Sequence, residues 1–365
     1  MVKDLRKTPS QVIAAGWQQI RKSIRLLRTD ESSWGHMTLT VLEICAGGGG
    51  QATGLEAAGF DLAAAIEIDN HACNTLRTNR PNWKIIETSV NDVDGADFRG
   101  VDLLAGGVPC PPFSIAGKQL GNEDERDLFP EALRLVQGAK PTAVLLENVP
   151  GFASDRFSAY RQSLQRKFFR LGYEAEWRVL NAHWFGVSQL RPRFVLVAFR
   201  GSFPDSFEWP EPNGHIAPSV GDALIDLMSS RDWKGAEKWR LRACGIAPTL
   251  VGGSKKHGGP DLGPTRAKKQ WAALGVDGLG LANDAPGPEH PVSFTPRLTV
   301  RMAARIQGFE DSWIFTGGKT AAYRQIGNAF PPPVAQAVGN AIRSVFLGKA
   351  SGARRVQMPL FAVAH

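Results

Sequence analysis

A cysteine that could act as a nucleophile, Cys110, lies in a glycine- and proline-rich segment, 106–114, that reads GGVPCPPFS. The segment follows the apolar run 101–105, which is typical of a buried parallel strand. Open α/β sheets hold their ligands just beyond the carboxyl ends of such strands, and prolines restrict the backbone around the sulfur. The alternative is a buried structural cysteine, which is the commoner role of a free thiol.

A carboxylate and two guanidinium groups lie at the ends of other expected strands. Glu147 ends the apolar strand 142–146, so its side chain is expected in the same crevice as the cysteine; the alternative is a capping or ion-paired acid. Arg191 and Arg193 alternate beside the expected strand 193–199, which places both on one face. They could bind phosphate or carbonyl oxygens, or they could belong to a solvated edge strand.

A glycine-rich turn, 45–50, follows the expected strand 38–44 and precedes a helix, as in loops that bind nucleotide cofactors. Glu67 ends the next strand, where a carboxylate can accept hydrogen bonds from ribose hydroxyls. The turn also satisfies the dinucleotide fingerprint, so a dehydrogenase remains possible. S-Adenosylmethionine needs the same turn for close approach, and this element alone does not separate the two cofactors.

Composition narrows the class of protein. An apolar fraction of 43% and a charged fraction of 21% are ordinary for a soluble globular chain of 365 residues. No run reaches the roughly 20 apolar residues of a membrane span, and no secretory signal is visible. The four cysteines lack paired spacing, which favours a reducing cytosol over disulfides or zinc. A net charge of +8 favours a polyanionic partner.

The rhythm of strands and helices predicts the domain organisation. Residues 1–37 form a basic extension, and 38–200 predict an α/β catalytic and cofactor-binding domain with a mostly parallel sheet. Over 201–317, proline, glycine, tryptophan and basic clusters predict a small, loop-rich lobe with a cationic face. Residues 318–365 return to the first domain through a helix over 334–346.

Taken together, these blocks resemble the cytosine-C5 DNA methyltransferase family of bacteria and phages. The match runs in family order over 41–199 and 296–341, and several short motifs in order are more specific than any one of them. The motifs are Glu43–Gly50, Pro109-Cys110, Glu147-Asn148-Val149, Gln189-x-Arg191-x-Arg193, the segment 297–309 and Gln325-x-Gly327-Asn328.

The resemblance implies a Rossmann-like, S-adenosylmethionine-dependent methyltransferase fold with a smaller target-recognition lobe. It implies methyl transfer to C5 of a cytosine that is flipped out of a specific duplex sequence. In this reaction the Cys110 thiolate would add to C6, and Glu147 would protonate or hydrogen-bond N3. Arg193 would hold the ring carbonyl and orient Glu147, and Arg191 would support the flipped backbone.

The resemblance also assigns ligand contacts residue by residue. The cofactor-binding residues are Glu43, Cys45, Ala46, Gly47, Gly49, Gly50, Glu67, Ile68, Ser89, Val90, Gly107, Pro109, Asn328 and Ala329. The DNA-binding residues are Ser114, Lys118, Gln119, Thr249 and Leu250, and no metal is expected.

Five positions depart from the family pattern. Cys45 stands where phenylalanine is usual, Glu43 and Ser89 replace aspartate, Pro111 replaces glutamine, and Met302 replaces an acid. We expect altered cofactor contacts from these changes, and no loss of the reaction.

Two other functions remain open: methylation of structured RNA, and DNA binding without catalysis. The expected partners are double-stranded DNA and a cognate restriction endonuclease, with no membrane. The protein is expected to be a monomer in the cytoplasm of a bacterium, at the nucleoid.

Overall fold

The computed structural model describes residues 38–109, 127–212, 216–253, 259 and 261–348. The N-terminal extension and the predicted site residues Cys110, Ser114, Lys118 and Gln119 lie outside the described residues, as does Pro111. Within the described ranges, no helix is both long and apolar enough to cross a bilayer.

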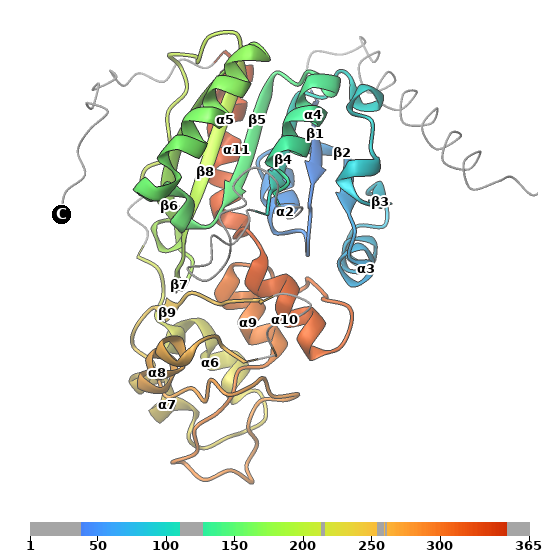
Figure 1. Cartoon of the computed structure of the whole chain (residues 1–365). Helices are drawn as coiled ribbons and strands as arrows, with labels where there is room; N and C mark the ends of the chain where they lie inside the picture. Colours follow the sequence, from blue (N-terminus) through green and yellow to red (C-terminus); the bar gives the residue numbers. More distant parts are fainter. Residues whose placement is uncertain (1–37, 110–126, 213–215, 254–258, 260, 349–365) are drawn as a thin grey trace, which may run out of the picture.

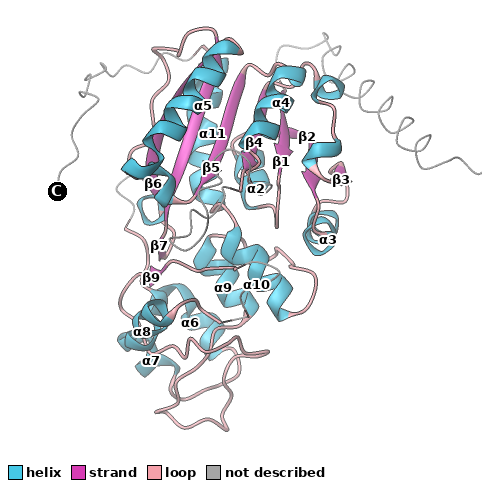
Figure 2. Cartoon of the chain, viewed as in Figure 1, coloured by secondary structure: helices cyan, strands magenta, loops and turns pink. Residues whose placement is uncertain are grey.

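A seven-stranded sheet forms the centre of the larger lobe (Figures 1 and 2). Its order is β3 (Ile85–Glu87), β2 (Phe60–Glu67), β1 (Leu39–Ile44), β4 (Leu103–Gly107), β5 (Ala143–Asn148), β8 (Pro192–Arg200) and β6 (Tyr173–Asn181). Strand β8 runs antiparallel to the other six strands of this sheet. The strand order reverses between β1 and β4, and such a switch point opens a crevice at the carboxyl ends of the strands. The predicted Rossmann-like fold is confirmed.

Helices cover both faces of the sheet because the strands are apolar on both sides. Along β1, Leu42 and Ile44 pack in the core under α4 (Phe129–Ala139) and α5 (Ser158–Arg170). The alternate residues of β1, Leu39 and Val41, pack under α2 (Gly50–Ala57) and α11 (Pro332–Phe346). The last two helices approach so closely that a Cβ on Gly54 would lie 2.3 Å from a backbone oxygen of α11.

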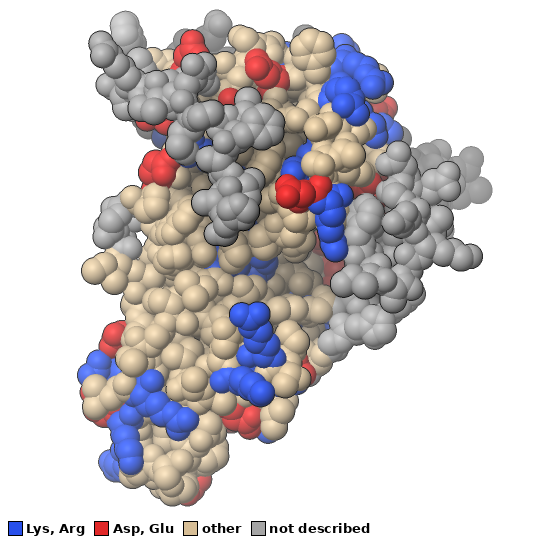
Figure 3. All heavy atoms as spheres, turned by 60° about the vertical axis from the view of Figure 1, so that its left-hand side comes forward, with Lys and Arg blue, Asp and Glu red and all other residues tan. Residues whose placement is uncertain are grey.

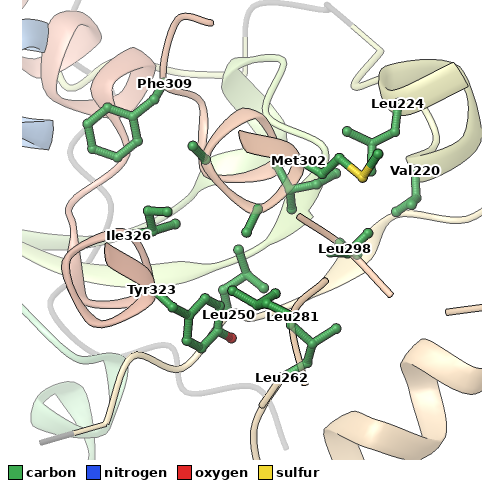
Figure 4. Packing of buried hydrophobic residues seen from close by; sticks show 14 of the residues in the cluster. Val220, Leu224, Leu250, Leu262, Leu281, Leu298, Met302, Phe309, Tyr323 and Ile326 are labelled. Atoms are coloured by element: carbon green, nitrogen blue, oxygen red, sulfur yellow. The ribbon is translucent and has the colours of Figure 1, made fainter. Parts of the chain in front are cut away.

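The smaller lobe is more helical than the sequence suggested. It contains α6 (Val220–Ser229), α7 (Ala236–Arg242), α8 (Thr265–Ala273) and α9 (Val300–Gln307), and α10 (Lys319–Asn328) packs on it. Its core contains Trp233, Trp239 and Trp271 together with the aliphatic residues of Figure 4. The lobe was predicted to be rich in loops, and the helices α6, α7 and α8 lie between those loops. Trp239 of α7 and Trp271 of α8 are buried in its core.

Packing also suggests different boundaries for the two lobes. Phe203 lies 5.3 Å from Phe199 of β8, ring centre to ring centre, and continues the core of the sheet past residue 200. At the other end, Tyr323 and Ile326 of α10 belong to the core of the smaller lobe. We therefore propose that the larger lobe runs to about Trp209 and resumes after α10.

A second, two-stranded sheet joins the lobes. In it, β7 (Gln189–Leu190) pairs in parallel with β9 (Ala247–Pro248). Because β7 directly precedes the two predicted site arginines, this pairing brings residues 247–253, which we call the recognition segment after their expected role, close to these arginines.

Candidate active site

A cavity of about 450 Å³ lies at the carboxyl ends of β1, β2 and β4 and is closed by the end of α10. Of the predicted cofactor residues, only Gly49 is absent from its lining. Those that line it are Glu43, Cys45, Ala46, Gly47, Gly50, Glu67, Ile68, Ser89, Val90, Gly107, Pro109, Asn328 and Ala329. Glu147 lines the same cavity. Their contacts with a cofactor stay predictions, but the fold brings these separated residues together.

The glycine-rich turn leaves one side open to the cavity. Gly47 has a φ of 54°, and a Cβ there would meet nothing within 4 Å. Gly49, with a φ of 90°, starts α2, and a Cβ there would lie 2.8 Å from Leu76 and Trp313. Gly49 therefore allows close packing at this turn.

Cys45, in the same turn, is a neutral thiol. Its burial, together with the nearby carboxylates of Glu67 and Glu43, raises its pKa to about 12.

The Glu67 carboxylate is fixed by three backbone amides. Gly47 donates to one oxygen at 2.7 Å, while Ile68 and Asp69 donate to the other at 2.8 and 2.7 Å. A carboxylate has about four acceptor positions, so Glu67 retains acceptor capacity for hydroxyl groups in the cavity. At the far side, the Ser89 hydroxyl accepts from the amide of Asn91 at 3.3 Å.

Other buried polar atoms beside the cavity have no partner among the described residues. They are both carboxylate oxygens of Glu43, both amide atoms of Gln51 and Oε1 of Gln325. Burial raises the pKa of Glu43 well above its ordinary value, and the charge of Glu67 adds to this. The backbone amide of Ala52 partly offsets this increase in the pKa, although it does not form a hydrogen bond of good geometry with the carboxylate. Buried polar atoms without partners cost free energy, so this arrangement suits a ligand that would satisfy them.

Glu147 and Arg193 form a buried ion pair at the edge of the cavity. Their Oε1 and Nε atoms are 2.7 Å apart, although the N–H is not aimed at the oxygen. Gly107 pairs with Glu147 across β4 and β5, and a Cβ on Gly107 would lie 3.2 Å from its Oε2. Burial raises the pKa of Glu147, and the charges of Arg193 and Arg191 offset only part of the increase. A raised pKa makes Glu147 a better proton donor near neutral pH.

Arg191 has different neighbours from Arg193. The alternation predicted that both side chains lie on one face; both are buried, and neither lines the cavity. Its guanidinium donates to the carbonyl oxygens of Leu250 at 2.6 Å, Gly327 at 2.6 Å and Ala329 at 3.0 Å. The expectation that Arg191 supports a flipped DNA backbone therefore needs correction, because its exposed surface is nil and the smaller lobe covers it.

Two residues that were predicted to contact DNA, Leu250 and Thr249, instead have their contacts within the protein. The Leu250 side chain is fully buried in the core of the smaller lobe, so a direct contact with DNA is corrected to a packing role. The Thr249 hydroxyl donates to the carbonyl oxygen of Leu190 at 2.6 Å. These two residues attach the recognition segment to β7.

Sequence reasoning assigned no role to several polar residues that build this region. Asn148 donates from Nδ2 to the carbonyl oxygen of Val108 at 2.8 Å, and thereby holds the start of the segment that carries the predicted nucleophile. Gln189 and Gln307 hydrogen-bond each other at 2.8 Å beneath Arg191. Asn148, Gln189 and Gln307 lie in the motifs quoted above, but a motif does not reveal which of its residues face a ligand.

The comparisons with known proteins agree with this arrangement. Residues 39–344 match the family model for C-5 cytosine-specific DNA methylases. The chain is 55% identical over 322 residues to the Type II methyltransferase M.NaeI of Lentzea aerocolonigenes, covering 87% of this chain and 78% of that protein. It is 53% identical over 311 residues to the Type II methyltransferase M.NgoMIV of Neisseria gonorrhoeae, covering 84% and 97%.

Solved structures share the fold. DNMT2 of Spodoptera frugiperda superposes with a TM-score of 0.59 at 17% identity, covering 84% of this chain and 100% of that chain. The Dnmt2 methyltransferase of S. pombe superposes with a TM-score of 0.57 at 18% identity, covering 85% and 98%. With the family model matched along most of its length, the chain belongs to the C-5 cytosine-specific DNA methylases and is a DNA (cytosine-5-)-methyltransferase.

Proposed function

We propose that this enzyme methylates C5 of a flipped-out cytosine in a specific duplex sequence, with Cys110 as the nucleophile and S-adenosylmethionine as the methyl donor. The observation that carries the proposal is the buried Glu147–Arg193 pair at the edge of a cavity that Glu67 and Glu43 also line. The pair supports a role for Glu147 as a proton donor beside a cavity that suits a polar ligand.

The cavity residues fit the cofactor because their unpartnered atoms match its polar groups. Glu67 would accept from the ribose hydroxyls, and Ile68, Ser89 and Val90 would surround the base. The unpartnered atoms of Glu43, Gln51 and Gln325 would meet the amino acid part. When bound, S-adenosylmethionine supplies a methyl group activated on a sulfonium.

The residues of the chain prepare the cytosine for that methyl group. The Cys110 thiolate adds to C6, which makes C5 nucleophilic. Burial raises the pKa of Glu147 and thereby favours its protonated form; in that form it would donate to N3 and draw charge from the ring as the thiolate adds. Arg193 holds Glu147 in place and offers its remaining N–H groups to the ring carbonyl.

A labelled-methyl assay with a diverse pool of duplex DNA tests the proposal. We expect 5-methylcytosine from the wild-type protein and none from Cys110→Ala, with DNA binding by the variant retained. Bisulfite sequencing of the product would identify the target sequence. Absence of 5-methylcytosine, transfer to an RNA pool in preference to DNA, or full turnover by Cys110→Ala would each refute it.

The relatives named above are Type II methyltransferases, which supports a restriction endonuclease of the same specificity as a partner. We propose that the chain acts as a monomer on double-stranded DNA in the bacterial cytoplasm, at the nucleoid. Size-exclusion chromatography with light scattering checks the monomer.

A further inference from the structure

Three consecutive glycines of the glycine-rich turn each lie against one aromatic ring. The pairs are Gly48 with Phe315, Gly49 with Trp313 and Gly50 with Phe309. A Cβ added to these glycines would lie 3.0, 2.8 and 3.3 Å from the respective rings. The described residues that line the cavity include none of the three rings. The ring triad (Phe309, Trp313 and Phe315) therefore supports the turn from outside the cavity.

Trp313 also holds the turn through a hydrogen bond. Its indole Nε1 donates to the carbonyl oxygen of Gly48 at 3.0 Å, and the side chain is buried. The guanidinium of Arg80 lies over the same ring, 5.3 Å from its centre, and forms an ion pair with Glu56 at 2.8 Å. The ring and its N–H are thereby held in one orientation toward the turn.

The backbone of the ring triad is tied to α3 (Asn70–Asn79) of the larger lobe. The side chain of Asn79 binds both main-chain groups of Ile314: its Oδ1 accepts from the amide at 2.8 Å, and its Nδ2 donates to the carbonyl oxygen at 2.7 Å. The amide of Thr316 donates to the hydroxyl of Thr75 at 2.9 Å. These hydrogen bonds fix the backbone that carries the rings.

The ring triad itself belongs to the smaller lobe. It lies between α9 and α10, and Phe309 and Trp313 are part of the core of that lobe (Figure 4 labels Phe309). A glycine-rich turn has much conformational freedom, which the binding of a ligand would have to remove. Holding the turn in place beforehand lowers this cost and therefore strengthens binding.

We propose that the ring triad positions the glycine-rich turn for the cofactor, with Trp313 as the positioning residue that holds Gly48; this inference rests on the proposed function. Because Trp313 does not line the cavity, it acts on the affinity for the cofactor and not on the methyl-transfer step. The smaller lobe, whose expected role is to recognise DNA, thereby also contributes to cofactor binding.

The test compares two variants that lose the same kind of hydrogen bond at different places. Trp313→Phe removes the N–H that binds Gly48 and keeps an aromatic ring. Trp239→Phe is the matched control, because the buried indole of Trp239 donates at 3.0 Å to the carbonyl oxygen of another glycine, Gly275, within the smaller lobe. Calorimetric titration with S-adenosylhomocysteine should give a Kd about 3- to 10-fold higher for Trp313→Phe, the range for one lost neutral hydrogen bond. The control should keep the wild-type Kd.

A second readout separates positioning from a general loss of structure. We expect Trp313→Phe to raise the KM for S-adenosylmethionine by the same factor, with kcat at saturating cofactor and the KM for DNA unchanged. The substitution is buried and leaves in place the Lys and Arg side chains on the surface of the smaller lobe, which Figure 3 shows. Both tryptophan variants should show a similar, small decrease in melting temperature.

Asn79→Ala loosens the ring triad without changing a ring, and it replaces Trp313→Phe if that variant does not fold. It frees both main-chain groups of Ile314, whereas its control, Asn74→Ala, removes a side-chain hydrogen bond elsewhere on α3. We expect Asn79→Ala to weaken the binding of S-adenosylhomocysteine and Asn74→Ala to leave it unchanged.

Hydrogen exchange of the amides of residues 47–50, measured without ligand, reports on the turn itself. We expect faster exchange in Trp313→Phe than in the wild type or in Trp239→Phe. Wild-type affinity for S-adenosylhomocysteine in a folded Trp313→Phe variant would overturn the proposal, as would an equal loss of affinity in both tryptophan variants or unchanged exchange of the turn. If the wild-type protein does not bind S-adenosylhomocysteine, the proposed function fails, while faster exchange in Trp313→Phe alone would still show that the ring triad holds the turn.

Discussion

Two buried polar regions lie close together in this enzyme, and they differ in whether their polar side-chain atoms have hydrogen-bond partners within the protein. In the cavity, Glu43 and Gln51 have no hydrogen-bond partner among the described residues. In the neighbouring region, which we call the Arg191 cluster (Gln189, Arg191 and Gln307), most polar side-chain atoms are hydrogen-bonded. Gln189 also accepts from the amide of Leu250 at 2.8 Å.

The difference separates a binding site from a structural joint. An unsatisfied buried polar group costs about 1–3 kcal/mol, so several of them together around a cavity suggest a ligand that would satisfy them. The Arg191 cluster does not need a ligand in this way, because backbone carbonyls of both lobes accept from Arg191, whose Nε alone has no partner among the described residues. Ala329 belongs to both regions: its carbonyl accepts from Arg191, and the residue lines the cavity.

The largest effect is expected where the cavity meets the chemistry. Glu147→Gln keeps the shape of the side chain and removes its acidic proton, so methyl transfer should fall by about 10²- to 10⁴-fold. Single-turnover rates on duplex DNA measure this, and anisotropy should give nearly wild-type DNA affinity. A variant with more than a tenth of the wild-type rate would show that N3 is not protonated by Glu147.

The next largest effect is expected on the free energy of unfolding and not on the rate of methyl transfer. Arg191→Met removes the donor to the carbonyl oxygens of Leu250 and Gly327, while that of Ala329 keeps Gln307 as a second donor, so the free energy of unfolding should fall by about 3–5 kcal/mol, as for other broken buried charge networks. Urea denaturation measures it. Arg178→Met is the control, since its ion pair with Glu211 is exposed and contributes at most about 1 kcal/mol. Unchanged stability with weakened DNA binding would return Arg191 to a ligand-binding role.

A smaller effect of the opposite sign is expected at Glu43. Glu43→Gln removes a buried carboxylate without partners, so the protein without ligand should be at least as stable as the wild type. Its affinity for S-adenosylhomocysteine should fall by roughly 10- to 100-fold, which corresponds to losing a charged hydrogen bond of about 1.5–3 kcal/mol. Calorimetry and urea denaturation test both halves. A destabilised variant with normal affinity would erase the contrast between the two regions.

The smallest effect is a pH dependence of stability. Burial raises the folded-state pKa of Glu43, so the folded protein holds this proton more tightly than the unfolded chain. The stability that this gives is fully present below about pH 4.3, the ordinary value for Glu, and is lost as pH rises through the raised pKa. Relative to Glu43→Gln, the wild type should therefore lose stability as pH increases over this window. Parallel unfolding curves would contradict a raised pKa.

Several strands were predictable because they are short apolar runs between turn residues. The strand expected over 193–199 lies within β8, and the strand expected over 38–44 begins one residue later. The cofactor turn was predictable for the same local reason. Helices α6, α7 and α8 were missed because they are short and lie in a stretch of sequence rich in proline, glycine and tryptophan.

Partners far away in the chain could not be predicted. Alternation placed Arg191 and Arg193 on one side, but it did not reveal that Leu250 and Gly327 cover the first and Glu147 the second. The unpartnered state of Glu43 was equally hidden, since it depends on what surrounds the side chain in three dimensions.

The hydrogen bonds of Arg191 to main-chain oxygens affect which residues of the smaller lobe can change in sequence. A backbone carbonyl is present in every residue type, so the attachment of the recognition segment at Leu250 makes little demand on side chains. Only glycine fits at position 252, because a Cβ on Gly252 would lie 2.5 Å from the carbonyl oxygen of Arg324. The smaller lobe is thus attached mainly through main-chain atoms, so its surface residues can change, or the lobe can be grafted from a relative, while the joint to the larger lobe remains the same.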